Sequence, residues 1–146
     1  MFWSVLKERG DNLSELKIKD FIKEVGENNV AHGFRDRENS FCEFIALIHS
    51  EVSEMLEEHR EGKYPTETYY TCKAKTRSDC RTIFPGVNTG CKGCEFAKPE
   101  GIPYECADAV IRLFDFADFY KIDLESAIIE KMNFNKTRPH MHGKTI

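Results

Sequence analysis

The stretch from Ser40 to Arg60, SFCEFIALIHSEVSEMLEEHR, decides the fold that we expect for this chain. Its apolar side chains recur every three or four residues and draw one stripe along a helix: Phe41, Phe44, Ile45, Ile48, Val52, Met55 and Leu56. Ser40 and Glu43 have the spacing of a capping box, which predicts that the helix begins here. We expect the helix to end near Gly62.

Two carboxylates leave one side of this helix. Glu51 and Glu54 are three residues apart, so their side chains lie one turn from each other. At about 100° per residue, Glu51 borders the apolar stripe. A carboxylate at the edge of buried surface loses water and needs a partner. For the remaining acids, Glu57, Glu58 and Glu61, we expect ordinary solvent-exposed charge.

A second pair of carboxylates, Glu105 and Asp108, falls in a helix that we expect from about Pro103 to Tyr120. Apolar side chains point nearly all round this helix, which predicts a central position. If it packs antiparallel to the first helix, four carboxylates face one another and repel unless they are protonated or bridged by cations. Such hard oxygen ligands suit Mg²⁺ or Mn²⁺. The alternative is a salt bridge from Asp108 to Arg112.

Length and charge limit the classes of protein to which the chain can belong. Its 146 residues suit one domain spanning 1–146, and its net charge of −4 argues against general nucleic-acid binding. No apolar run is long enough to span a bilayer, and charged residues follow the apolar N-terminus too soon for a secretory signal. We therefore expect a cytoplasmic protein whose six cysteines are thiols or metal ligands rather than disulfides.

The segment 63–100 differs in character, because turn-forming residues replace the apolar periodicity. An irregular insertion of this length between the two acidic helices needs something to order it. Four of its cysteines, two of them in a CxxC motif, are suited to a tetrahedral structural Zn²⁺ site: Cys72, Cys80, Cys91 and Cys94. Free thiols or a redox-active CxxC pair are the alternatives. We expect Cys42 and Cys106, which fall within helices, to be small buried residues.

Two further helices are predicted near the ends of the chain. The first is short and amphipathic and stops near Gly26. The last begins at Asp123, a good N-cap, and ends before Pro139. Its helical row starts apolar and becomes basic, so we expect Lys131 and Asn135 to point inward. Extension of Lys131 into solvent and a disordered C-terminal tail are the alternatives.

This ordered set of features resembles the MazG-like, all-α nucleoside triphosphate pyrophosphohydrolases. The resemblance covers roughly residues 28–62 and 100–144. It depends on ExxE at Glu51 and Glu54, ExxD at Glu105 and Asp108, a helix with Lys131 and Asn135, a basic C-terminal end, and the loop His32-Gly33-Phe34. The cysteine-rich insertion is a departure, because the family joins its two acidic helices by a shorter connection.

The resemblance implies an all-α antiparallel helical bundle that binds Mg²⁺ through the four acids. Such proteins cleave a (d)NTP between its α and β phosphates, which yields a (d)NMP and pyrophosphate. Glu54 would then orient or deprotonate the attacking water. Contacts to phosphate or sugar would come from Lys131, Asn135, Arg138 and Lys144. Family members assemble as dimers or tetramers, so we expect a homo-oligomer.

Two other functions are consistent with the same residues. In one, the protein is a non-catalytic binding module: the basic insertion, ordered by zinc, binds an acidic partner or a nucleic acid, and the helices only support it. In the other, the helical fold binds a nucleotide as a sensor and does not hydrolyse it.

Overall fold

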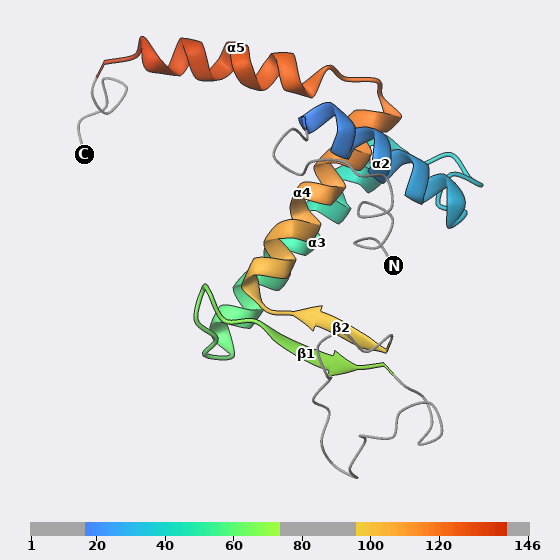
Figure 1. The fold of residues 1–146 in the computed structure, drawn as a ribbon, viewed down its shortest axis with the longest axis vertical. Coiled ribbons are helices and arrows are strands. Elements are labelled where there is room, and N and C mark those ends of the chain that lie inside the picture. Colours follow the sequence, from blue (N-terminus) through green and yellow to red (C-terminus); the bar gives the residue numbers. More distant parts are fainter. Residues whose placement is uncertain (1–16, 74–95, 140–146) are drawn as a thin grey trace, which may run out of the picture. The chain divides into compact units, whose positions relative to one another are not determined.

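The computed structural model describes residues 17–73 and 96–139. These residues form α2 (Ile18–Ala31), α3 (Phe41–Arg60), β1 (Tyr69–Cys72), β2 (Ala97–Glu100), α4 (Ile102–Phe119) and α5 (Leu124–Lys136) (Figure 1). The described part of the chain is therefore mostly helical, as predicted. The chain divides into two compact units: a central unit, Asn39–Leu113, and a terminal unit, Met1–Glu38 with Phe114–Ile146.

Helix α3 matches its sequence prediction closely. The Ser40 hydroxyl accepts a hydrogen bond from the Glu43 N–H at 3.2 Å, and the Glu43 carboxylate accepts one from the Ser40 N–H at 2.7 Å. This reciprocal pair satisfies two donors that the first helical turn would otherwise leave unbonded. Gly62, with φ +87°, follows the C-terminus of the helix.

Within the central unit, α3 and the first part of α4 lie side by side and run in opposite directions (Figure 1). The predicted antiparallel pairing of the two acidic helices is thus present. Among the described residues of this unit, Phe44 and Ala109 are the buried hydrophobic side chains, with 3% and 8% exposure. The two buried side chains come from α3 and α4, the same helices that carry the acidic residues.

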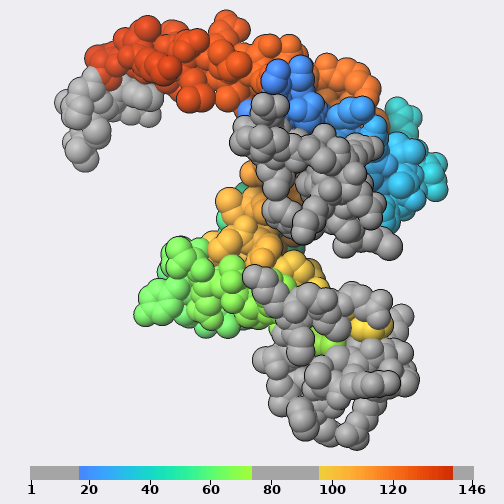
Figure 2. Space-filling view, viewed as in Figure 1, coloured from blue at the N-terminus to red at the C-terminus, as the bar shows by residue number. Residues whose placement is uncertain are grey.

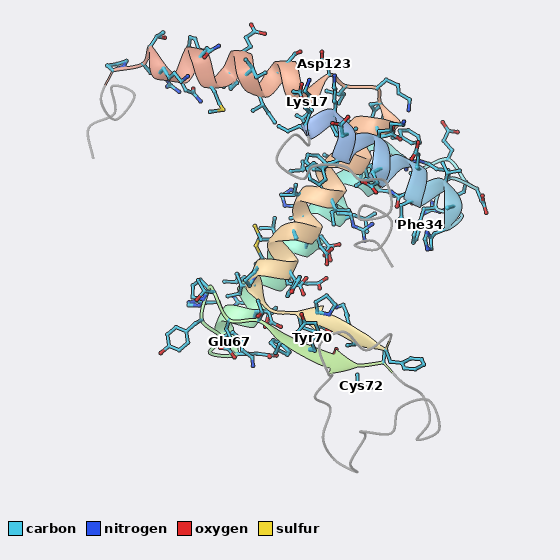
Figure 3. The ribbon with its side chains drawn as sticks, in the orientation of Figure 1. Lys17, Phe34, Glu67, Tyr70, Cys72 and Asp123 are labelled. Atoms are coloured by element: carbon cyan, nitrogen blue, oxygen red, sulfur yellow. The ribbon has the colours of Figure 1, made fainter. Side chains whose placement is uncertain are left out.

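A β-hairpin occupies the two ends of the segment that the sequence predicted to be irregular, so that prediction is wrong there. The strands pair antiparallel, from Tyr69 opposite Glu100 to Cys72 opposite Ala97. Figure 3 labels Tyr70 and Cys72 on β1. The Tyr-Tyr-Thr run has high β propensity, but its partner strand lies far along the chain, where local periodicity gives no sign of the pairing.

The hairpin is anchored to both helices of the central unit. The Tyr69 hydroxyl donates a 2.7 Å hydrogen bond to Glu58, which is half-buried rather than fully solvent-exposed as expected. The Lys63 ammonium lies 4.3 Å from the centroid of the Tyr69 ring. Gly101, with φ +109°, joins β2 directly to α4, and a Cβ there would lie 2.5 Å from the Glu67 carbonyl oxygen. Glycine is therefore required at this corner.

In the terminal unit, α2 continues through Gly26, where the sequence predicted its end. Gly26 is buried against α4, and a Cβ at this position would lie 2.3 Å from Asp118 Oδ2. The glycine thus permits a close approach to Asp118 instead of terminating the helix. Arg35 makes ion pairs with Asp115 and, at 3.6 Å, with Asp118. At the start of α5, Asp123 accepts a hydrogen bond from the Ser126 N–H at 3.1 Å, which confirms the predicted N-cap.

Large apolar side chains are exposed on several helices of the described chain. On α3, three of them lie on one face of the helix, because positions 41, 52 and 56 are separated by nearly whole numbers of helical turns. The side chains of α5, orange to red in Figure 2, are open to solvent on the face in view. The exposed set on these two helices is Phe41, Leu47, Val52 and Leu56 with Ile129, Met132 and Phe134. Within residues 17–73 and 96–139, no helix combines the length and apolar character needed to cross a bilayer.

Candidate metal centre

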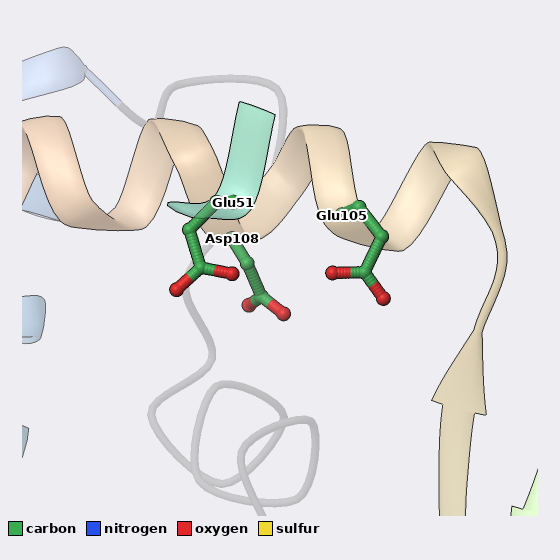
Figure 4. Close-up of side chains that lie close together, drawn as sticks. All are labelled: Glu51, Glu105 and Asp108. Carbon is green, nitrogen blue, oxygen red and sulfur yellow. The ribbon is translucent and has the colours of Figure 1, made fainter. Parts of the chain in front are cut away.

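Three carboxylates of the central unit converge on one small volume. Glu51 projects from α3, and Glu105 and Asp108 project from α4, with one oxygen of each lying within 4.8 Å of the others (Figure 4). Figure 4 shows the three carboxyl groups directed to the same side of α4. The prediction that acids from these two distant segments come together is confirmed for these three residues.

The three acids differ in burial and in their partners. Glu51, 8% exposed, accepts a 2.9 Å hydrogen bond from Arg112 Nε. Arg112 thus pairs with Glu51. The salt-bridge alternative required it to pair with Asp108 instead. Glu105 is only 4% exposed, and within the described residues its carboxylate has neither a hydrogen bond nor an ion pair. Little exposure without such partners disfavours the ionised form of a carboxylate, and a cation bound between the three acids would offset this cost.

The pKa values of two of the three acids are raised, which indicates that their negative charge is not fully compensated. Burial raises the pKa of Glu105, the negative charge of Glu54 raises it further, and the Lys98 ammonium opposes the rise. Burial also raises the pKa of Asp108, followed by the charge of Glu51, and Lys98 again opposes the rise. The positive charges among the described residues therefore do not compensate the cluster. A divalent cation would reverse both shifts.

Glu54 is beside the cluster rather than part of it. Its side chain is exposed, its Oε1 lies 3.5 Å from the Ser50 hydroxyl, and its carboxylate is outside the group of converging oxygens. Its charge still acts on Glu105 and Asp108. The expected set of four ligands is therefore seen as three converging carboxylates with a fourth carboxylate nearby.

The residues predicted to bind phosphate or sugar belong to the terminal unit. Lys131 and Asn135 on α5 are exposed, so the expectation that they point inward is wrong for the described chain. The reason is that α5 has no fully buried position. Arg138, just beyond α5, is also exposed, and Lys144 lies outside the described residues. A shallow hollow of about 430 Å³ on α5 is lined by Ala127, Glu130, Lys131 and Phe134.

The cysteines are described only in part. Cys72 ends β1 as a half-buried free thiol, whereas Cys80, Cys91 and Cys94 lie outside the described residues. Cys42 and Cys106 are free and exposed, so the prediction that they are buried is wrong. Cys42 is the second residue of α3 and Cys106 the fifth residue of α4, and other described residues leave both side chains uncovered.

Sequence reasoning missed two residues near the cluster, Lys98 and Glu100. They alternate along β2, and the Lys98 ammonium donates a 2.6 Å hydrogen bond to the Glu100 carboxylate. Their i, i+2 spacing would have identified a shared strand face, but only if the strand itself had been recognised.

Comparison with known proteins finds no matching family model, no matching curated protein and no matching solved structure.

Proposed function

We propose that this protein is a metal-dependent nucleoside triphosphate pyrophosphohydrolase built on a MazG-like antiparallel helical bundle and acting in the cytoplasm. The observation that carries the proposal is the buried, unpaired Glu105 carboxylate beside Glu51 and Asp108. The antiparallel α3 and α4, which bear the ExxE and ExxD spacings, support it further.

The donor set is suited to a hard divalent cation. Three carboxylate oxygens within 4.8 Å of one another are ligands of the kind that Mg²⁺ and Mn²⁺ prefer. We therefore propose that Glu51, Glu105 and Asp108 hold Mg²⁺ or Mn²⁺. When bound, the ion neutralises triphosphate charge and lowers the pKa of a coordinated water.

In the proposed reaction, Glu54 orients the attacking water and accepts its proton. Its exposed carboxylate, next to the cluster, suits this role better than a fully enclosed ligand would. The water oxygen forms a bond to the α-phosphorus while the bond to the α–β bridging oxygen breaks. Pyrophosphate leaves, and the nucleoside monophosphate retains the new oxygen. The side chains proposed to contact phosphate or sugar are Lys131, Asn135, Arg138 and Lys144.

The decisive experiment is incubation of the full chain with a panel of NTPs and dNTPs and Mg²⁺, with pyrophosphate as the measured product. We expect pyrophosphate and a monophosphate from at least one substrate, and loss of turnover in Asp108→Asn. Glu57→Gln is the matched control, because Glu57 lies on α3 but pairs with Arg60 outside the cluster. No pyrophosphate from any nucleotide would refute the catalytic proposal. Tight nucleotide binding without products would instead favour a sensor.

We also propose a structural Zn²⁺ held by Cys72, Cys80, Cys91 and Cys94. The half-buried free thiol of Cys72, at the point where β1 enters the cysteine-rich segment, supports this proposal. Elemental analysis of protein purified without added metal should give about one zinc per chain. Zinc should be lost in Cys72→Ser, and less than about a tenth of a zinc per chain in the unmodified protein would refute the site.

Finally, we propose that the chain forms a homo-oligomer, a dimer or a tetramer. Its support is the contrast between few buried hydrophobic residues and many exposed large ones in the described chain. Exposed apolar surface of this extent is typical of an association interface. Sedimentation velocity at micromolar concentration should show a species of at least twice 16.9 kDa. A single monomeric species would exclude the proposal.

A further inference from the structure

A buried carboxylate in the hairpin has no role in the reaction as proposed above. Glu100 is 8% exposed, and both of its oxygens are occupied. Oε1 accepts a 2.7 Å hydrogen bond from the Thr71 hydroxyl, and Oε2 accepts a 2.6 Å hydrogen bond from the Lys98 ammonium. The Lys73 ammonium also lies 3.9 Å from Oε1. Because burial and these donors fix its orientation, Glu100 also fixes the position of the Lys98 ammonium.

The hairpin places this ammonium at the start of the acidic helix. Lys98 pairs with Thr71 across the two strands and shares a strand face with Glu100. The obligatory glycine at position 101 then turns the chain directly into α4, whose first turn carries Glu105. The charge of Lys98 acts on both Glu105 and Asp108. Lys98 is therefore a cation that the central unit itself supplies to the carboxylate cluster.

The chemistry of Lys98 leaves room for a ligand. An ammonium has three N–H donors, and within the described residues Lys98 donates to Glu100 alone. Its side chain is 45% exposed, so the other donors are accessible to solvent. A triphosphate that binds beside metal-holding carboxylates needs positive groups around its remaining oxygens.

We propose that Lys98 binds a phosphate oxygen of the triphosphate, and that Glu100 and Thr71 are positioning residues that hold its ammonium for this contact. This inference rests on the proposed function of the same site. It adds a phosphate-binding residue from the hairpin to those expected on α5 and in the C-terminal tail.

The probe is inorganic tripolyphosphate with Mg²⁺, titrated into the full chain by calorimetry. Lys98→Met should weaken binding at least about tenfold, which corresponds to about 1.4 kcal/mol. Lys73→Met is the matched control, because it removes the same charge beside the same carboxylate. Unlike Lys98, Lys73 is not one of the strongest charges acting on Glu105 or Asp108. We expect Lys73→Met to bind within about twofold of the unmodified protein.

A double-mutant cycle tests the positioning role. Glu100→Gln should also weaken binding, but Lys98→Met combined with Glu100→Gln should bind no more weakly than Lys98→Met alone, because Glu100 acts through Lys98. Additive losses would indicate a merely structural role for Glu100. Lys98→Gln keeps a donor for Glu100 without the charge and replaces the methionine variant if that variant does not fold.

The results separate this inference from the proposed function. Binding by the unmodified protein that Lys98→Met weakens, without hydrolysis of any nucleotide, would support the phosphate contact while the hydrolase proposal fails. The inference is overturned if the unmodified protein does not bind tripolyphosphate, if Lys98→Met and Lys98→Gln bind as well as it does, or if Lys73→Met is weakened equally.

Discussion

Replacement of Glu105 by glutamine should stabilise the metal-free protein while it removes the response to Mg²⁺. Carboxylate oxygens of the cluster lie within 4.8 Å of one another. At that separation two unit charges repel by about 3 kcal/mol at an effective dielectric constant of about 20, and by about 1 kcal/mol in water. Glu54 and then Asp108 are the strongest negative charges acting on Glu105, so the relief is mainly from repulsion by these two carboxylates. We therefore expect Glu105→Gln to raise the free energy of unfolding by about 1–3 kcal/mol at pH 7.

The dependence on pH follows from the direction of the pKa shifts. Folding raises the pKa of Glu105 and Asp108 above their ordinary values of 4.5 and 3.8. The stability associated with these groups is thus complete below the ordinary values and is lost as the pH rises through the raised ones. The advantage of Glu105→Gln should accordingly be present at pH 7 and vanish near pH 4.

The assay is urea unfolding followed by circular dichroism, after removal of Mg²⁺ by dialysis and again with Mg²⁺ added. At one hundred times its dissociation constant, Mg²⁺ should stabilise the unmodified protein by about 2.7 kcal/mol and the variant by much less. Glu57→Gln, on the exposed side of α3, should behave as the unmodified protein does. Destabilisation of metal-free Glu105→Gln at pH 7, or an undiminished response to Mg²⁺, would refute the reasoning.

Three other substitutions have defined outcomes. Arg112→Gln should reduce the stability of the metal-free protein, because it removes the hydrogen bond to Glu51. It should also lower the Mg²⁺ dissociation constant several-fold, measured by calorimetry, because the guanidinium and the ion compete for the Glu51 carboxylate. Weaker Mg²⁺ binding would contradict this. Ser40→Ala should cost about 1 kcal/mol in urea unfolding through loss of the N-cap, whereas Ser40→Asp should restore it; equal stability of both variants would argue against the cap. Tyr69→Phe should cost about 1–2 kcal/mol, because it removes the donor to Glu58; unchanged hydrogen exchange in β1 would exclude the anchoring role.

The periodicity of the sequence predicted the acidic helices well, because their patterns are local. The predicted capping pair is present at the start of α3. The bounds of α4 each differ from the prediction by one residue. Convergence of Glu51, Glu105 and Asp108 followed from helical spacing and an antiparallel arrangement. These features depend on neighbours within a few turns of helix, which a single sequence displays directly.

Features that depend on distant contacts were not predictable in the same way. Gly26 was interpreted as a helix end because its packing against Asp118 involves a segment far along the chain. The strand character of Ala97–Glu100 is weak, and only the pairing with β1 makes Lys98 and Glu100 neighbours on one face. The exposure of Cys106 likewise depends on how much of α4 its neighbours cover, a quantity that composition does not give.

The paired strands have a consequence for how the cysteine-rich segment can change in evolution. The chain leaves β1 at Cys72 and returns to β2 at Ala97, directly opposite, so the two points of attachment are held together whatever residues connect them. Doubling the length of a loop costs only about 0.6 kcal/mol in closure entropy. Changes in length between these points that retain the four cysteines should therefore leave the paired strands in place, and with them the start of α4 and its acidic residues.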